Sequence, residues 1–162
     1  MQSAKNYYYV FRGASLVNVV CNIAKNRAYP DFNDDAKFNN LSQQTMEVLF
    51  KANAFPNQLN TLMGIEGHYL LRMGDAGVPS NQLQVATSSG NLTSTDLTFE
   101  SNKWYHVAVT FNRGNIKVYV NGEEKYAGNV SMSSVDLGAK HHNEEDGSRV
   151  FWIGYSYSSD RF

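Results

Sequence analysis

The sequence has little of several features on which whole classes of protein depend. Cys21 is its single cysteine among 162 residues, so neither an intrachain disulfide nor a cysteine-based metal site can form. No apolar run approaches the ~20 residues that a membrane-spanning helix needs. No basic run occurs and the formal net charge is −1, so a nucleic-acid partner and an anionic membrane surface both lack electrostatic support.

What the sequence does contain is aromatic residues and strand formers. Ten Tyr and nine Phe, with modest charge, suit a β-rich globular protein and argue against disorder. The length predicts one domain over residues 1–162 with a core of its own. Residues 1–5 have neither the basic start nor the apolar core of a signal peptide, and we expect the chain to be a fragment of a larger protein.

The clearest pattern lies in residues 104–122, WYHVAVTFNRGNIKVYVNG. From 104 to 111 nearly every residue is aromatic or β-branched, which predicts a mostly buried strand. Residues 116–120 alternate between apolar and polar, which predicts a strand with one buried face. Turn formers at 112–115 join the two strands. Asn121-Gly122 predicts a second hairpin, because a type I′ turn needs positive φ at both central positions.

Further strands are predicted along the whole chain, with turn-forming residues between them. They cover 7–11, 16–23, 45–50, 61–65, 68–73, 82–86, 125–130 and 150–154, and residues 97–99 lead towards the central strand. The segment 88–96 is predicted to be a polar connection, and a helix over 14–25 is an alternative that its β-branched residues disfavour. The spacing is typical of a sandwich or a barrel, so the predicted fold class is all-β.

The two central segments also resemble a known family. WYHVAVTF (104–111) followed by IKVYVNG (116–122) is similar to the signature of bacterial-type laminin G-like domains, in the concanavalin A-like lectin and glucanase superfamily. The resemblance is clearest over roughly residues 45–155. It implies a two-sheet antiparallel jelly-roll sandwich, commonly a carbohydrate- or protein-binding module. It also implies a parent protein that is extracellular, on the cell surface or periplasmic.

The end of the chain departs from this family pattern. Such domains usually close with a further Gly and a last strand, for which residues 155–162 offer no counterpart. A sandwich lacking its last strand keeps an open edge, which invites pairing with another chain. A homodimer or a strand exchange through that edge is the expected consequence.

The resemblance further implies a calcium site, which related domains hold in loops at one end of the sandwich. Glu66, between two mid-chain strands, and Asp160, after the late strand, occupy the matching places. Ca²⁺ takes six to eight oxygens, so backbone carbonyls and waters would supply the rest. Asp31, Asp34 and Asp35 also cluster, but their spacing does not match a calcium loop and favours a solvated one.

Sugar binding needs an aromatic platform beside hydrogen-bonding groups. Tyr155 and Tyr157 supply exposed-looking rings with polar neighbours, and His142 and Asn143 can approach from the preceding loop. These four residues form the predicted carbohydrate site, and the alternative is that the two tyrosines are ordinary sandwich surface.

Several other conspicuous residues receive structural interpretations. Trp104 and Trp152 each lie within an apolar strand, which predicts that both belong to the core. His106 is predicted to be hydrogen-bonded within the sandwich rather than catalytic. Cys21 has apolar neighbours and is predicted to be a small buried hydrophobe.

Catalysis is not expected. A jelly-roll glucanase needs two carboxylates about 5–5.5 Å apart. Residues 144–146 offer half of that pattern, but Arg149 stands where the second Glu is needed, and no Gly-x-Ser-x-Gly motif occurs. His141 and His142, beside these acidic residues, could bind a transition metal but lack a defined ligand spacing, so a solvated loop is preferred.

The sequence therefore predicts a non-catalytic recognition module. Its expected partner is a glycan or an extracellular protein, with no nucleic acid and no membrane insertion, and calcium is the one cofactor suggested. An adhesion or spacer domain is the first alternative and predicts a flat patch without sugar affinity. A glycoside hydrolase is the second, and predicts two carboxylates facing each other on one sheet.

Overall fold

The computed structural model describes residues 6–12, 16–22, 39–55, 58–65, 68–87, 92–137 and 152–153. Every helix or strand in these ranges is a β-strand, numbered β1 to β11 along the chain. Within the same ranges, no helix is long and apolar enough to cross a membrane.

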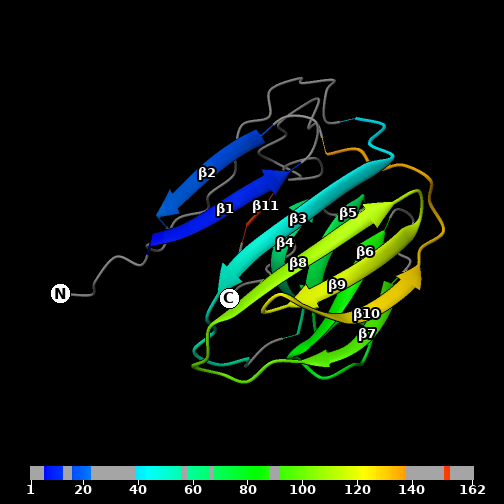
Figure 1. Cartoon of the computed structure of the whole chain (residues 1–162). Coiled ribbons are helices and arrows are strands. Elements are labelled where there is room, and N and C mark those ends of the chain that lie inside the picture. Colours follow the sequence, from blue (N-terminus) through cyan, green and yellow to red (C-terminus); the bar gives the residue numbers. More distant parts are fainter. Residues whose placement is uncertain are drawn as a thin grey trace, which may run out of the picture.

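The first sheet has six strands in the order β10-β9-β8-β3-β1-β2 (Figure 1). All neighbours pair antiparallel. The strands are β1 (Asn6–Arg12), β2 (Leu16–Asn22), β3 (Gln43–Phe50), β8 (Tyr105–Asn112), β9 (Asn115–Val120) and β10 (Glu123–Asn129). The central pair, β3 and β8, joins segments far apart in the sequence, whereas β8, β9 and β10 form the predicted meander.

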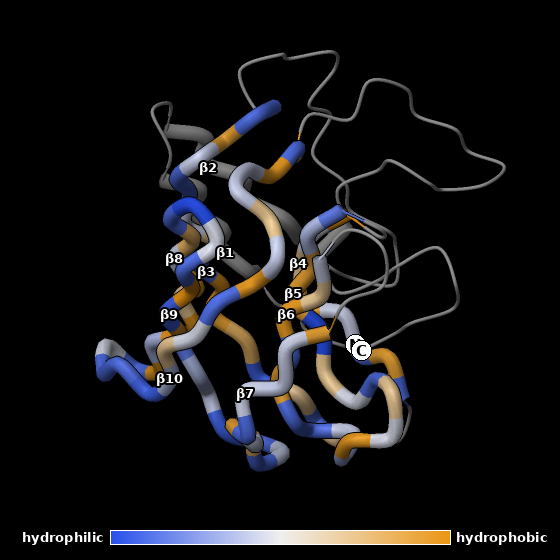
Figure 2. Tube along the Cα trace, turned by 90° about the vertical axis from the view of Figure 1, so that its right-hand side faces the viewer, coloured by the Kyte–Doolittle hydropathy of each residue, from blue (hydrophilic) through white to orange (hydrophobic). Residues whose placement is uncertain are grey.

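The second sheet has five strands in the order β11-β4-β5-β6-β7, again antiparallel. They are β4 (Asn60–Ile65), β5 (Tyr69–Met73), β6 (Gln82–Thr87), β7 (Leu92–Thr98) and β11 (Trp152–Ile153). Figure 2 shows β3, β8, β9 and β10 in one layer and β4, β5 and β6 in another. The predicted all-β two-sheet sandwich is thus confirmed.

Most strand predictions agree with the structure, including β2, which is a strand and not the alternative helix. The predicted polar connection over 88–96 was wrong, because β7 begins at Leu92. Thr95 shows why: its side chain is buried and its hydroxyl donates to the carbonyl of Leu83 on β6, 2.7 Å away. A threonine-rich strand keeps β-branched side chains but has a polar composition, so it resembles a loop in the sequence.

Both turns of the meander have positive φ at their two central residues, as predicted for Asn121-Gly122, whereas for residues 112–115 only a turn was predicted. The φ angles are 48° and 90° at Arg113 and Gly114, and 53° and 86° at Asn121 and Gly122. Positive φ at both central residues is characteristic of type I′ turns, whose twist matches that of the flanking strands. Each connection is two residues long, which fixes the register of β8, β9 and β10 locally.

The hydrophobic core lies between the two sheets. The rings of Tyr69 on β5 and Phe111 on β8 meet edge to face with centroids 5.8 Å apart, and Phe99 packs against Phe50 at 5.3 Å. Other fully buried members are Met46, Met63, Leu71, Met73, Leu83, Val85, Val107, Val109, Ile116 and Val118. These contacts bring side chains of both sheets into one apolar layer.

The two hairpin glycines allow a matched test of backbone strain. At Gly114 a Cβ atom would lie 2.9 Å from the carbonyl oxygen of Val130 and 2.8 Å from that of Met132, whereas at Gly122 it would meet nothing within 4 Å. Both residues have positive φ, so alanine is strained at either. We expect Gly114→Ala to lower the free energy of unfolding by about 3 kcal/mol and Gly122→Ala by about 1 kcal/mol. Urea unfolding measures both, and equal losses would contradict the clash.

The Tyr69 phenol is fully buried in the core, beside the Gln44 side chain. Burial raises the pKa of Tyr69 above its ordinary value, and the Gln44 side chain opposes that shift only in part. Among the described residues, neither the Tyr69 hydroxyl nor the Gln44 amide has a hydrogen bond of normal geometry. We infer that the removal of this phenol from water is the main cause of its raised pKa.

The raised pKa predicts a pH dependence of stability. The unfolded tyrosine releases its proton near about pH 10, while the folded one holds it to higher pH. The stabilisation is therefore complete below about pH 10 and is lost as the pH rises from there towards the folded pKa. We expect the wild type to lose unfolding free energy more steeply than Tyr69→Phe between about pH 8 and about pH 11. Parallel losses in urea titrations would contradict the shift.

Candidate functional site

All residues predicted to bind sugar or calcium lie outside the described residues, so those assignments remain predictions. They are Tyr155, Tyr157, His142, Asn143, Glu66 and Asp160. The same holds for residues 31–35 and 141–146 and for the side chains of Cys21 and Trp152. The nearest described backbone is that of β4, which ends at Ile65 directly before Glu66, and that of β11, where Ile153 pairs with Met63.

The five-stranded sheet is buried on both of its faces along β5. On β5 the side chains of Tyr69, Leu71 and Met73 belong to the core, so Leu70 and Arg72 point to the opposite side. Yet Leu70 and Arg72 are only 1% and 5% exposed. The side of this sheet that faces away from the core is therefore buried along β5.

A row of polar side chains occupies that buried side and satisfies its own hydrogen bonds. Arg72 Nη1 lies 3.0 Å from Asp75 Oδ2, and Arg72 Nε lies 3.5 Å from Thr61 Oγ1. Gln84 accepts from the backbone N–H of Asp75 at 2.7 Å and donates to Ser94 Oγ at 3.3 Å. Buried polar groups need such partners, so the row is a structural network that ties β4, β5, β6 and β7 together.

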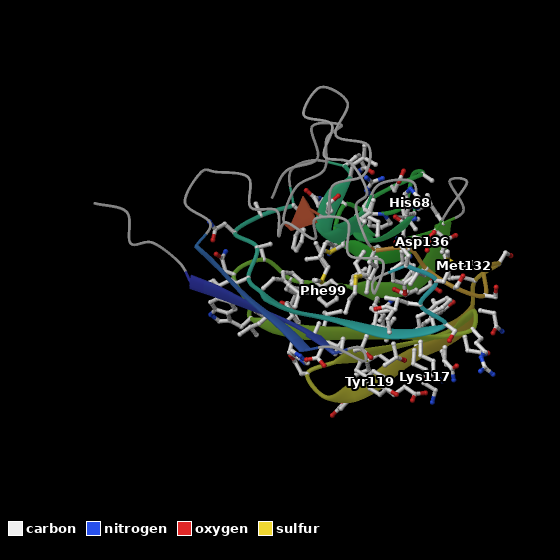
Figure 3. All side chains as sticks on the ribbon, turned by 90° about the horizontal axis from the view of Figure 1, so that it is seen from above. His68, Phe99, Lys117, Tyr119, Met132 and Asp136 are labelled. Atoms are coloured by element: carbon white, nitrogen blue, oxygen red, sulfur yellow. The ribbon has the colours of Figure 1, made fainter. Side chains whose placement is uncertain are left out.

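The six-stranded sheet instead turns one side to solvent. We call the solvent side of β3, β8, β9 and β10 the open face. Its side chains alternate with those of the core and are Gln43, Thr45, Glu47, Leu49, His106, Ala108, Thr110, Asn112, Asn115, Lys117, Tyr119 and Glu124. In Figure 3, Lys117 and Tyr119 lie on the outer side of this sheet, while Phe99 lies between the two sheets.

Trp104 corrects a prediction, because it is 49% exposed rather than part of the core. The next residue, Tyr105, packs inside against Phe50 and Phe99, with ring centroids 5.8 and 4.9 Å away. Neighbours of an inward residue in extended chain point outward, so Trp104 belongs with the open face. Leu49, 41% exposed and paired with His106 in the ladder, is the other large exposed hydrophobic among the described residues.

The loop before Trp104 is fastened to the body of the sandwich. The backbone N–H of Asn102 donates to the carbonyl of Ala52 at 2.7 Å, and Asn102 has a φ of 64°, which asparagine tolerates better than most residues. The backbone N–H of Glu100 donates to the Tyr105 hydroxyl at 3.1 Å. These bonds, with Tyr105 anchored in the core, fix the point from which the Trp104 side chain projects.

His106 also differs from its prediction. Its side chain does not point into the sandwich but is 42% exposed on the open face, with Nε2 3.5 Å from Glu47 Oε2. Its backbone exchanges two bonds with Asn121: the His106 N–H donates to Asn121 Oδ1 at 3.0 Å, and the Asn121 N–H donates to the His106 carbonyl at 2.8 Å. The hairpin turn is thereby held against the start of β8.

Tyr119 lies on the open face beside a charged pair. Lys117 Nζ is 2.9 Å from Glu124 Oε2, and the Tyr119 hydroxyl is 3.3 Å from the same oxygen. The hydrogen bond from Lys117 is the main cause that lowers the pKa of Glu124, and it raises the pKa of Lys117 in return. Both groups therefore stay charged near neutral pH and balance each other.

The remaining carboxylates are also engaged. Besides Glu47, Asp75 and Glu124, the described carboxylates contact the following partners: Asp96 contacts Gln82, Glu100 contacts Lys103, Glu123 contacts Lys125, and Asp136 accepts from the backbone of Asn40. No group of three or more His, Cys, Asp or Glu side chains in the described part of the chain is placed to hold a metal ion.

The sequence predicted that β9 has one buried face, but it missed the part of the open face that lies on β8, because residues 104–111 were treated as one buried run. Strict alternation would have placed Trp104 and His106 with Thr110, on the polar side, and Tyr105 with Val107 and Phe111, on the apolar side. The signal was present, but a strand of almost wholly apolar and aromatic residues does not reveal by itself which of its two sides faces solvent.

Several solved structures are similar to this chain, among them the following three. A candidate carbohydrate-binding protein from Bacteroides ovatus is 28% identical over 98% of this chain, with a TM-score of 0.63. The chain covers 39% of that protein, about two-fifths of its length. Domain 4 of AbnA, a GH43 extracellular arabinanase from Geobacillus stearothermophilus in complex with arabinotriose, is 18% identical over 87% of this chain and 72% of its own, with a TM-score of 0.49.

Domains LG4-5 of the mouse laminin α1 chain are 9% identical over 98% of this chain and 37% of that one, with a TM-score of 0.48. The similarities to the arabinanase domain and to laminin are too distant to support an argument about function.

No curated protein matches the sequence. A laminin G family model, described as the concanavalin A-like lectin/glucanases superfamily, matches residues 25–162. The chain therefore belongs to the laminin G-like group of the concanavalin A-like lectin and glucanase superfamily.

Proposed function

We propose that this chain is a non-catalytic recognition module whose ligand is carbohydrate. The observation that carries the proposal is the similarity to the Bacteroides ovatus protein, which extends over 98% of this chain at 28% identity. That protein is described as a candidate for carbohydrate binding, and the shared region is about two-fifths of its length. The proposal therefore concerns binding by this module and not the activity of a larger protein.

The arrangement of carboxylates supports a role without catalysis. Glu47 and Glu124 both lie on the open face, but β8 and β9 separate them, which puts their Cα atoms about 14 Å apart at the usual strand spacing. Glycosidases place their two carboxyls about 5 to 9.5 Å apart. A general acid also needs a raised pKa, whereas the pKa of Glu124 is lowered by Lys117.

The setting that we propose is outside the cell, in a surface, secreted or periplasmic protein, as the family resemblance implies. Tyr155, Tyr157, His142 and Asn143 remain the proposed contacts in the loops, with calcium near Glu66 and Asp160. An adhesion domain that binds protein is the competing function, because the open face offers a broad sheet surface. The two functions differ in whether isolated glycans bind.

A glycan screen tests the proposal directly. The purified chain is applied to an array of plant, bacterial and animal glycans, once with calcium and once with the chelator EGTA. We expect binding to a restricted set of glycans. If a sample that unfolds cooperatively binds no glycan on the array, the result contradicts a carbohydrate-binding module and favours the adhesion alternative.

Calcium binding has its own prediction. If Glu66 and Asp160 hold Ca²⁺, saturating calcium raises the melting temperature of the wild type by about 5 °C, because a ligand that binds only the folded state stabilises it. Glu66→Gln and Asp160→Asn should each abolish the increase. Glu123→Gln, on the exposed strand β10, is the matched control and should retain it. If calcium does not change the melting temperature of the wild type, the proposed calcium site is wrong.

A further inference from the structure

The open face has the composition of a binding surface and not only of solvated sheet. Trp104 and Leu49, 49% and 41% exposed, stand at the end of the face where β8 begins. Tyr119, the last residue but one of β9, is half-buried and lies opposite Ala108 of β8 in the ladder. Aromatic rings that are exposed or partly exposed on a rigid sheet offer flat apolar surface at a low entropic cost, because the backbone that holds them is already ordered.

The two rings are too far apart for one sugar. Trp104 precedes Ala108 by four residues, and Tyr119 sits on the neighbouring strand beside Ala108. A rise of about 3.4 Å per residue and a strand spacing of about 4.8 Å put the Cα atoms of Trp104 and Tyr119 about 14 Å apart. That distance is longer than a single pyranose or furanose ring, so one ligand that reaches both must be a chain of several sugars.

Hydrogen-bonding groups lie between the rings and beside them, because His106 is on β8 and Glu47 is on the neighbouring strand β3. The His106 imidazole and the Glu47 carboxylate are neighbours on the open face, with Nε2 and Oε2 3.5 Å apart. The Asn121 side-chain oxygen is used by the His106 backbone, which leaves its amide N–H groups to donate. Donors and acceptors are thus both present along the path, as recognition of sugar hydroxyls requires.

The charges of the open face favour a neutral ligand. Lys117 is paired with Glu124, and the carboxylate of Glu47 lies beside His106, so these side chains provide no excess of positive charge. A polyanion such as a nucleic acid or an acidic glycan needs a cationic path, which these paired side chains do not provide. An uncharged, hydroxyl-rich chain matches this balance of charges.

We propose that the open face binds a neutral polysaccharide along its chain, with Trp104 and Tyr119 as the two stacking platforms. The residues of this site are different from those predicted around Tyr155, and the inference rests on the proposed carbohydrate-binding function. The closed side of the five-stranded sheet has no comparable role, because its side chains along β5 are buried and Arg72 is engaged by Asp75.

The test uses calorimetry with neutral oligosaccharides of xylan, arabinan, mannan and β-glucan, from disaccharide to hexasaccharide. For the series that binds, we expect affinity to rise with length until both rings are reached. Trp104→Ala and Tyr119→Ala should each weaken hexasaccharide binding about tenfold, because each removes one aromatic stacking contact. Trp104→Phe, which keeps a ring, should retain most of the affinity.

Lys103→Ala is the matched control, since Lys103 is the exposed neighbour of Trp104 and its ammonium is engaged by Glu100. It should bind like the wild type. All variants are compared by melting temperature, so that a loss of folding is not mistaken for a loss of binding. Glycan binding that is unaffected by Trp104→Ala and Tyr119→Ala, or that does not depend on ligand length, overturns this site but leaves the proposed function intact.

Two other results also overturn the site. Binding of acidic glycans alone contradicts the neutral ligand. If no glycan binds, either in calorimetry or on the array, the proposed function is wrong and so is this inference.

Discussion

The register between β3 and β8 is the constraint on which the rest of the six-stranded sheet depends. These strands pair from Gln43 opposite Asn112 to Phe50 opposite Tyr105. Because side chains alternate, this register sends Val107 and its apolar neighbours into the core and leaves Glu47 and His106 in solvent. A slip of one residue would exchange the two sides, burying charges and exposing the core.

The two sheets of the sandwich differ in how their outer sides are covered. The five-stranded sheet is buried on both sides along β5, and its outward polar groups, Arg72 above all, are used by one another. The six-stranded sheet keeps a polar side in water, with Lys117 paired to Glu124 and two aromatic rings on the same side. A module that recognises a ligand needs such an accessible, rigid surface, and the described residues offer it on the open face.

The start of β8, at one end of the open face, is held in place by both local and long-range contacts. Asn121 has the positive φ that its turn requires, and its side chain also accepts from the backbone of His106. Tyr105, on the other side of His106, is anchored in the core against Phe50 and Phe99. The position of Trp104 therefore depends on a hairpin, a core contact and a loop bond together. Its exposure is a property of the assembled sandwich and not of its own segment.

The sequence by itself determined the fold class, most strands, the positions of both turns of the meander, the type I′ turn at Asn121-Gly122 and, by resemblance, the family. These features follow from local chemistry: β-branched residues favour strands, and Asn-Gly tolerates positive φ. It did not reveal β7, because threonine-rich strands resemble loops in composition. Only the tertiary structure decided that Trp104 and His106 lie outside the core and that Arg72 lies buried. Which side of a strand meets water depends on what packs against its sheet, and that partner comes from distant parts of the chain.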